Sequence, residues 1–180
     1  MKFPLLLTAA ALAAQDPGPV RSVASVDLAR YAGVWHEVAR FPNKFQAKCL
    51  AETVATYGLL REGQIRVVNS CRGPDGKTIR AEGRARLADK AGPTSRLKVR
   101  FAPAFLSWLP MVWGDYWVLD LTDDYNAALV GTPDRKYLWV LSRTPELADS
   151  AWQRLVTAAA GQGFDVARLV RADGEGRRAR

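Results

Sequence analysis

Few side chains in this sequence carry the chemistry of catalysis or metal binding. Among its 180 residues there is one histidine, His36, and two cysteines, Cys49 and Cys71, while an acid, Glu37, stands in a mostly apolar stretch. A single histidine argues against a histidine-rich metal site and against a Ser-His-Asp triad. We therefore expect no metal and no cofactor, and the chemistry left to consider is that of one carboxylate and two thiols.

Glu37 lies in a predicted strand that also carries Trp35. Residues two apart on a strand share a face, so Glu37, Ala39 and Phe41 are predicted to lie on the side of Trp35, with His36 pointing outward. If that side faces an apolar cavity, the carboxylate needs a partner such as an arginine, because an unpaired buried charge is costly. Structural pairing is the interpretation we favour, and contact with a ligand head group is the alternative.

The start of the chain has the features of an export signal. Met1-Lys2 precedes an apolar run to Ala14, and Ala11-Leu12-Ala13 is an acceptable cleavage site. The run is too short to span a bilayer. No cysteine stands near the cleavage site, so the lipid anchor of a bacterial lipoprotein is not expected. We predict a signal peptide at 1–14, a linker at 15–25, one domain at 26–172 and a basic disordered tail at 173–180.

The predicted export of the protein bears on the state of its two cysteines. Cys49 and Cys71 flank a predicted hairpin nearly symmetrically about its turn at Glu62-Gly63, so they could lie opposite each other on adjacent strands. In an exported protein such a pair predicts a disulfide. The alternative is a reactive thiol that acts on a lipid.

The composition predicts a single folded domain with a basic surface. Hydrophobic residues make up 48% of the chain and the formal net charge is +8. The basic residues are spread along the predicted strands, and no RNA-binding signature accompanies them, so nucleic acid is not an expected partner. The charge indicates a solvated surface, or a weak attraction to anionic lipid head groups.

The elements that must position these residues are mostly strands at short, regular spacing. Eight are predicted, at 34–41, 52–57, 64–69, 78–87, 96–101, 116–121, 126–130 and 137–141. None is separated from the next by a helix long enough for a parallel crossover. We therefore predict an all-β fold, an eight-stranded antiparallel up-and-down barrel, which either fills its interior or holds one small ligand.

One helix follows the strands and is predicted to pack outside the barrel. Thr144-Pro145-Glu146 has the residue types of an N-cap and first turn, and Gly161 those of an exit. Between them apolar residues recur on one face, namely Leu147, Ala151, Leu155 and Ala158. Residues 166–170 could add a last short strand.

Three blocks of this chain resemble the signature of the lipocalin family. They are Gly33-Val34-Trp35 at the first strand, Thr122-Asp123-Asp124-Tyr125 between the sixth and seventh strands, and Arg143 after the eighth. Within that family the chain more closely resembles bacterial lipocalins of the Blc type, which are similar to apolipoprotein D, and the likeness runs from about Leu28 to Val170. Two departures are His36, where a tyrosine is common, and the second aspartate in the turn.

The resemblance implies structural roles for the signature residues. Trp35 is expected at the closed end of a lipocalin calyx, with the Arg143 side chain across its indole and its donors on strand-end carbonyls. Gly33 would allow close approach, and Asp123 would accept hydrogen bonds from backbone amides of the turn. We expect Gly33, Trp35, Asp123, Tyr125 and Arg143 to hold the barrel rather than contact ligand.

The proline-rich segment 101–114 is neither a regular strand nor a helix. Up-and-down topology places it at the same rim as the cysteines and the 42–48 loop, and in lipocalins that rim is the open mouth. Its large apolar residues could line the entrance, cover it, dip into a membrane interface, or fold onto the barrel. These residues are Phe105, Trp108, Leu109, Met111 and Trp113.

The resemblance implies a protein that is not an enzyme and that binds a fatty acid or a (lyso)phospholipid in its barrel. Glu37, Ala39, Phe41 and the rim residues are the candidate ligand contacts. The implied setting is lipid transport, storage or envelope maintenance under stress, in the periplasm or outside the cell and in possible contact with the outer membrane. The alternatives are a lipid- or isoprenoid-modifying enzyme, a tetrapyrrole or pigment binder, and a barrel with a filled interior.

Overall fold

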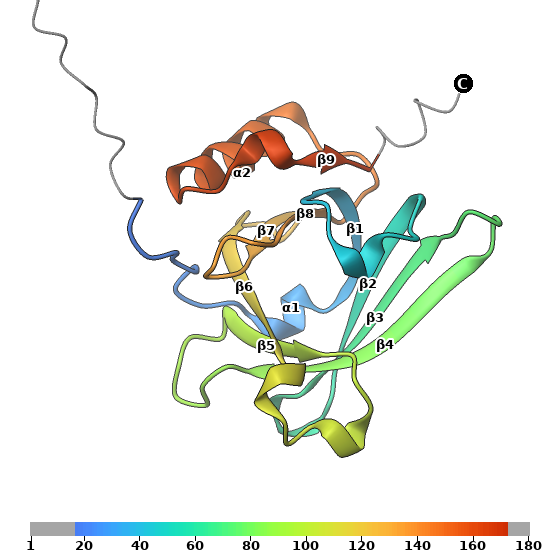
Figure 1. Cartoon of the computed structure of the whole chain (residues 1–180). Coiled ribbons are helices and arrows are strands. Elements are labelled where there is room, and N and C mark those ends of the chain that lie inside the picture. Colours follow the sequence, from blue (N-terminus) through green and yellow to red (C-terminus); the bar gives the residue numbers. More distant parts are fainter. Residues whose placement is uncertain (1–16, 173–180) are drawn as a thin grey trace, which may run out of the picture.

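Eight antiparallel strands form a closed barrel in the computed structural model, which describes residues 17–172 (Figure 1). From β1 to β8 each strand pairs with the next along the chain, and β8 pairs with β1, which closes the barrel. The short β9 adds to β1. The strands are β1 (Gly33–Arg40), β2 (Ala51–Leu59), β3 (Ile65–Arg72), β4 (Thr78–Leu87), β5 (Arg96–Arg100), β6 (Gly114–Leu121), β7 (Ala127–Gly131), β8 (Leu138–Ser142) and β9 (Val170–Arg171).

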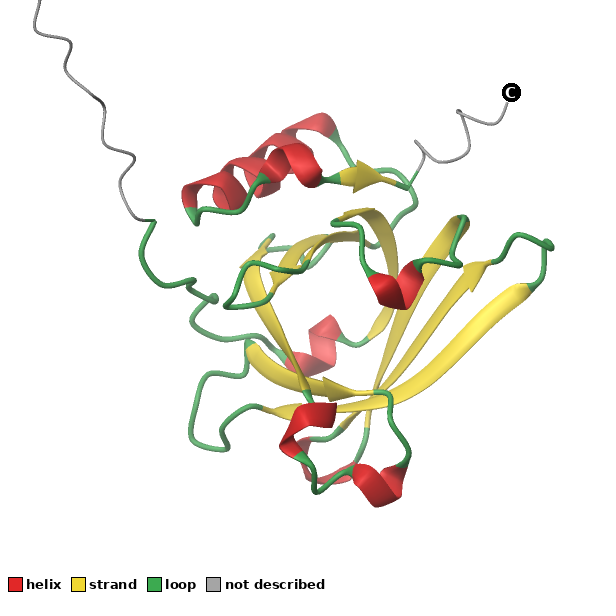
Figure 2. Ribbon diagram, in the orientation of Figure 1, coloured by secondary structure: helices red, strands yellow, loops and turns green. Residues whose placement is uncertain are grey.

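The predicted fold class is confirmed, and all eight barrel strands are present with ends within three residues of the expected ones. Two α-helices and five short 3-10 turns complete the chain (Figure 2). They are α1 (Leu28–Tyr31), α2 (Asp149–Gly161), η1 (Lys44–Gln46), η2 (Arg61–Gly63), η3 (Ala104–Leu106), η4 (Pro110–Val112) and η5 (Val166–Arg168). The predicted signal peptide and the predicted tail lie outside the described residues.

Helix α2 lies outside the barrel, as predicted, and covers β6 and β7 (Figure 1). Leu155 and Ala159 are fully buried in a core with Leu129 and Val140 of the barrel wall. The chain leaves the helix through Gly163, whose φ of +78° suits a glycine. This outer core is separate from the core inside the barrel.

The predicted start of α2 is wrong. The helix begins at Asp149, and its N-cap residue Ala148 makes no side-chain hydrogen bond. The Thr144 hydroxyl donates to the Glu146 carbonyl oxygen at 2.6 Å and so is not used as a cap. The segment between them bends, and Leu147 packs on the outer core before the helix begins.

One end of the barrel is closed by α1 and by the segment that precedes it. The Asp27 side chain caps α1 by accepting from the amides of Ala29 and Arg30. The segment predicted as a linker packs on the barrel: Val20 is buried in the outer core, and at the closed end the Val23 amide donates to the Val118 carbonyl oxygen at 2.9 Å. The opposite end, which faces the viewer in Figure 1, is the mouth.

Candidate functional site

The closed end of the barrel is built around Trp35. Its indole is fully buried, and the Arg143 guanidinium carbon lies 3.9 Å from the ring centroid. Arg143 also donates to the carbonyl oxygens of Val34, Arg30 and Tyr125 at 2.9, 2.7 and 3.2 Å. The expected guanidinium-on-indole contact, with donors on strand-end carbonyls, is therefore present.

Gly33 is required at the start of β1 for two reasons. Its φ of +99° is a conformation that side chains with a Cβ rarely adopt. A Cβ there would also lie 3.2 Å from Arg143 Nη1. The glycine thus lets the arginine approach the backbone beside Trp35.

The turn between β6 and β7 is held by residues other than the one expected. Asp124 and Thr122 accept the hydrogen bonds from the Asn126 amide, each at 3.1 Å. Asp123, predicted for that role, instead offers its carbonyl oxygen to Arg30 at 2.9 Å. The prediction was wrong because the turn holds two consecutive aspartates, and only the side chain of the second, Asp124, accepts a hydrogen bond from a backbone amide of the turn. Tyr125 accepts from the Asp27 amide at 3.0 Å and so ties the turn to α1.

Three tyrosine hydroxyls meet inside the barrel above Trp35. Tyr116 shares hydrogen bonds of 2.8 Å with Tyr31 and 3.0 Å with Tyr57. The Tyr31 ring lies 4.9 Å from Trp35 and 5.7 Å from Tyr57. This cluster was not predicted from the sequence, although Tyr57 and Tyr116 occupy inward positions of their strands, and the alternation of facing along each strand indicates this.

Burial raises the pKa of the Tyr57 hydroxyl to about 12, and it raises the pKa of Tyr31 and Tyr116 well above their usual 10. The unfolded chain loses these protons near pH 10 while the folded protein keeps them, so stability falls as the pH rises above about 10. Between pH 9 and 11 we expect Tyr57 alone to account for about 1.4 kcal/mol of that fall. Urea unfolding at both pH values checks this; a Tyr57→Phe variant with an unchanged pH profile would contradict it.

Solvent reaches the interior face of the barrel from the mouth. Val99 and Trp139 point inward near the mouth yet keep partial exposure, whereas Trp35 and Leu141, toward the closed end, are buried. Side chains of a filled barrel would be buried along the whole axis. The graded exposure therefore describes an interior that is packed at the closed end and accessible near the mouth.

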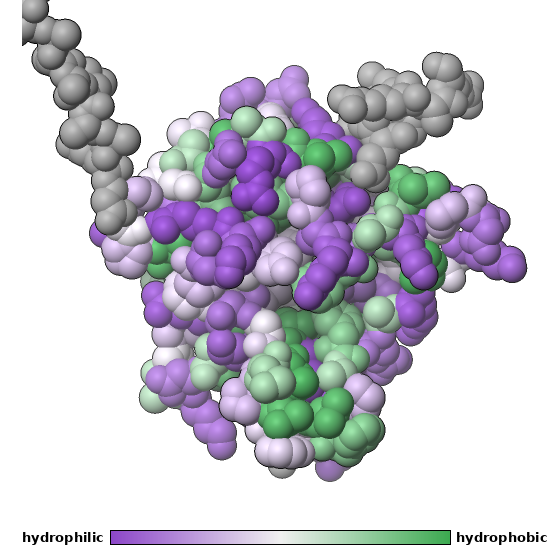
Figure 3. Space-filling model, in the orientation of Figure 1, coloured by the Kyte–Doolittle hydropathy of each residue, from purple (hydrophilic) through white to green (hydrophobic). Residues whose placement is uncertain are grey.

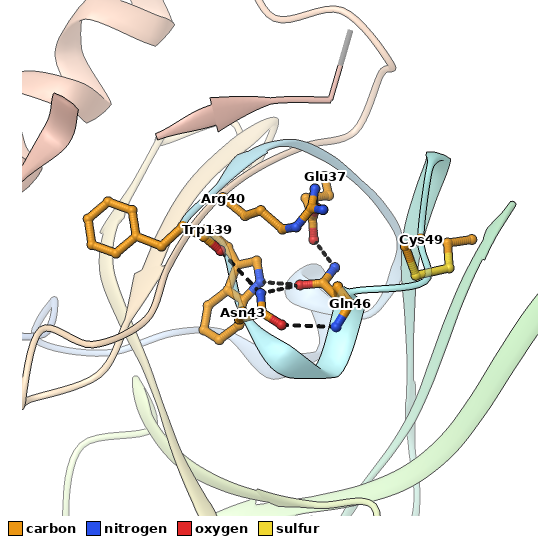
Figure 4. Close-up of polar contacts among 8 residues, drawn as sticks. Glu37, Arg40, Asn43, Gln46, Cys49 and Trp139 are labelled. Atoms are coloured by element: carbon orange, nitrogen blue, oxygen red, sulfur yellow. Dashed lines mark hydrogen bonds and ion pairs between the residues drawn. A yellow bond between two sulfur atoms is a disulfide. The ribbon is translucent and has the colours of Figure 1, made fainter. Parts of the chain in front are cut away.

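A buried polar cluster lies near the mouth, beneath the η1 turn (Figure 4). Arg40 Nη1 lies 3.1 Å from Glu37 Oε1, and both side chains are at least nine-tenths buried. Gln46 donates to Glu37 Oε2 at 2.5 Å and accepts from the Trp139 indole at 3.1 Å. Asn43 donates to the Gln46 side-chain oxygen at 2.8 Å. Glu37 thus has an arginine partner, the pairing that we favoured from the sequence.

The prediction that Ala39 and Phe41 face the interior with Trp35 is wrong. Glu37 pairs in register with Leu141, but Ala39 pairs with the very next residue of β8, Val140, so the register shifts at this point. Such a bulge adds one residue to one strand and reverses the facing of those that follow. Ala39 and Phe41 consequently belong to the outer core beneath α2.

Cys49 and Cys71 form the predicted disulfide, with Cα atoms 5.5 Å apart. The bond joins the chain after η1 to the end of β3, beside the polar cluster (Figure 4). Neither thiol is therefore available as a nucleophile while the bond is intact.

Removing the disulfide is expected to lower the free energy of unfolding by about 3 kcal/mol, because it closes a loop of 22 residues in the unfolded chain. Urea unfolding of a Cys49→Ser/Cys71→Ser variant measures this loss. Dithiothreitol should destabilise the parent protein to the same extent and leave the variant unchanged. Two titratable thiols in the denatured, unreduced protein would show that the bond does not form.

The rim segment 101–113 presents apolar side chains to solvent, and they gather over η3 and η4 in Figure 3. Phe105, Trp108 and Met111 are 74%, 76% and 85% exposed, and Leu109 is partly exposed. Trp113 lies elsewhere: its ring stacks against Arg86 and Arg100, with guanidinium carbons 4.2 and 5.2 Å from the centroid. Both arginines point away from the interior, so Trp113 anchors the segment on the outer face of the barrel and does not line the entrance.

The described residues offer neither a metal-binding cluster nor a membrane-spanning helix. Within residues 17–172, no three histidine, cysteine or acidic side chains gather where they could hold a metal ion. No helix in this range has the length and apolar character needed to cross a membrane.

The chain is similar to known proteins in sequence. Residues 26–173 match a lipocalin-like domain. The temperature-induced lipocalin-1 of Arabidopsis thaliana is 43% identical over 148 residues, covering 82% of this chain and 78% of that protein. The outer membrane lipoprotein Blc of Escherichia coli K12 is 38% identical over 177 residues, covering 93% and 94%. Mouse apolipoprotein D is 28% identical over 155 residues, covering 82% and 76%.

Solved structures share the fold at lower identity. Insecticyanin from the tobacco hornworm Manduca sexta superposes with a TM-score of 0.66 at 23% identity, over 84% of this chain and 82% of that one. Lobster apocrustacyanin A1 gives a TM-score of 0.62 at 19% identity, over 85% and 89%. Sequence and fold agree along almost the whole described chain, and the protein therefore belongs to the lipocalin family, which binds small hydrophobic ligands.

Proposed function

We propose that this protein binds a fatty acid or a lysophospholipid in its barrel and serves lipid transport, storage or envelope maintenance. The observation that carries the proposal is the order of surfaces along the barrel axis. An interior of apolar side chains, accessible near the mouth, is followed by the Glu37–Arg40–Gln46 cluster. That order suits a ligand with an apolar chain and a polar head.

The energetics need no covalent step. Each buried CH₂ contributes about 0.8 kcal/mol, so one acyl chain supplies useful affinity by leaving water. The groups that an enzyme on this scaffold would need are already engaged: Cys49 and Cys71 are joined, and Glu37 is ion-paired. Binding and release at equilibrium is the mechanism that these contacts favour.

The proposed setting is the cell envelope. The Escherichia coli relative is named an outer membrane lipoprotein. The apolar start of the sequence fits export, and the disulfide fits an oxidising compartment. We infer that the protein works in the periplasm or outside the cell, at or near a membrane.

Native mass spectrometry of the purified protein, followed by lipid extraction, tests the ligand. A bound mass that the extraction identifies as a fatty acid or lysophospholipid is the expected result. A coloured protein with a visible absorbance band would assign a pigment instead. A protein that is empty and does not take up added fluorescent acyl probes would contradict ligand binding altogether.

The rim segment is expected to help ligand move between a membrane and the barrel. Replacing Trp108 and Leu109 with serine removes apolar surface that is outside the interior, so it should slow uptake of an acyl probe from vesicles several-fold. Probe that is supplied in solution should bind with the same affinity. Stopped-flow fluorescence separates the two; equal rates from vesicles in variant and parent would argue against this role.

A further inference from the structure

A second cleft lies outside the barrel, between the rim segment and the outer face of β4 and β5. Its volume is about 210 Å³, and it is lined mainly by Gln64, Arg84, Arg86, Arg100, Ser107 and Trp113. Arg84 and Arg86 alternate along β4 with Ala85, which is buried in the inner core. The arginines therefore point away from the interior, and this cleft is distinct from the proposed ligand cavity.

The arginines of the cleft repel one another when no anion is bound between them. Arg84 is the direct register partner of Arg100 on one side and of Arg66 on the other. Like charges directly opposite each other on neighbouring strands destabilise a sheet. Glu82 forms an ion pair with Arg66 at 2.7 Å and interacts with Arg84 at longer range, but no described carboxylate lies within ion-pair distance of Arg84, Arg86 or Arg100.

Arg100 is the residue that most strongly indicates a bound anion. Its side chain stands at the cleft although only 8% of the residue is exposed. Nη1 donates to the carbonyl oxygens of Ala102 and Pro103, each at 2.6 Å, while the buried Nε has no described hydrogen-bond partner. A buried guanidinium with a spare donor is costly unless an acceptor completes it.

We propose that this cleft binds the phosphate group of an anionic lipid head group in a membrane surface. Arginine forks match phosphate oxygens in pairs, and Arg84, Arg86 and Arg100 surround one small space. The exposed Phe105, Trp108 and Met111 belong to the rim segment that forms one wall of this cleft. Apolar side chains beside a phosphate site match the layering of a bilayer interface, with acyl chains below the phosphates.

The site would hold the mouth of the barrel at the membrane. The rim segment connects β5 to β6 at the mouth, and its Ser107 and Trp113 line the phosphate cleft. The net charge of +8 adds long-range attraction to an anionic surface. The inference does not depend on what the barrel holds, because the two sites lie on opposite faces of the same strands.

The test is co-sedimentation with vesicles of phosphatidylcholine alone or with one-third phosphatidylglycerol. Arg84→Gln/Arg86→Gln should weaken binding to the anionic vesicles about tenfold or more, since each basic residue at the surface contributes strongly. The control Arg21→Gln/Lys90→Gln removes the same charge from exposed positions away from the cleft and should change binding less than twofold. Arg84→Gln alone guards against a loosened rim segment, because Arg84, unlike Arg86, does not stack on Trp113.

A second arm separates lipid phosphate from free phosphate. The indole N–H signal of Trp113, assigned with a Trp113→Phe variant, should shift in nuclear magnetic resonance spectra when inorganic phosphate is added, and Arg84→Gln should abolish the shift. A phosphate-dependent shift without binding to anionic vesicles would overturn the lipid assignment and leave a free-anion site. Anionic vesicle binding that is equal in the cleft and control variants would overturn the site. Unchanged uptake of acyl probe from solution shows in either case that the barrel is intact.

Discussion

Replacing Trp35 with alanine is expected to lower the free energy of unfolding by about 3–5 kcal/mol, the range for a large buried aromatic side chain. The indole is fully buried and packs on the Tyr31 ring at 4.9 Å. Its Nε1 donates to the Tyr31 carbonyl oxygen at 2.8 Å, and Arg143 lies over its face. Alanine removes all three contacts at once and leaves a cavity at the closed end.

Urea unfolding of Trp35→Ala gives this loss directly, and Trp108→Ala is the matched control. Trp108 is 76% exposed, so the same substitution there should change stability by less than about 0.5 kcal/mol. Trp35→Phe should recover part of the loss because it refills some of the volume. Similar losses for Trp35→Ala and Trp108→Ala would mean that Trp35 does not hold the barrel as described.

Breaking the buried Glu37–Arg40 pair from one side is expected to destabilise the protein by about 3–5 kcal/mol, because the remaining charge stays buried without its ionic partner. This applies to Arg40→Met and to Glu37→Met. The double variant Glu37→Met/Arg40→Met should lie within about 1 kcal/mol of the parent, since two apolar side chains of similar volume replace a desolvated ion pair.

The exposed pair Arg66–Glu82, at 2.7 Å, is the control for this cycle. Arg66→Met should cost less than about 1 kcal/mol, because solvent screens an exposed pair. If the loss in Glu37→Met/Arg40→Met equals the sum of the two single losses, the pair is not coupled and the interpretation fails. If instead the double variant is stable, its affinity for a fatty acid can be compared with its affinity for the methyl ester of that acid. The ratio of the two affinities, set against that of the parent protein, tests whether the ion pair selects the head group of the ligand.

Much of the fold could be predicted from the sequence because local patterns specify it. The eight strands follow one another at short spacing, with no helix between them long enough for a parallel crossover, and this spacing requires antiparallel neighbours. Gly33, Trp35 and Arg143 were identified by a resemblance, and their contacts follow from backbone conformation and stacking. The cysteines pair because the hairpin between them brings them to adjacent chain segments.

The wrong predictions concern places where a single residue changes how two elements of the fold pack together. The bulge in β1 is a mismatch in residue count between β1 and β8, so it depends on a partner far away in the sequence. It moved Ala39 and Phe41 from the cavity to the core beneath α2. The start of α2 shifted for a similar reason, because Leu147 packs on the barrel before the helix begins.

By itself, the sequence determined an antiparallel barrel with a capped end, an external helix and one disulfide, because periodicity, glycine conformation and cysteine spacing are local properties. Only the tertiary structure decided which charges meet. It placed Gln46 and Trp139 around Glu37 and Arg40, and it folded the rim segment against Arg86 and Arg100. Those contacts join residues from separate strands and loops, so they depend on register and packing, which no local pattern encodes.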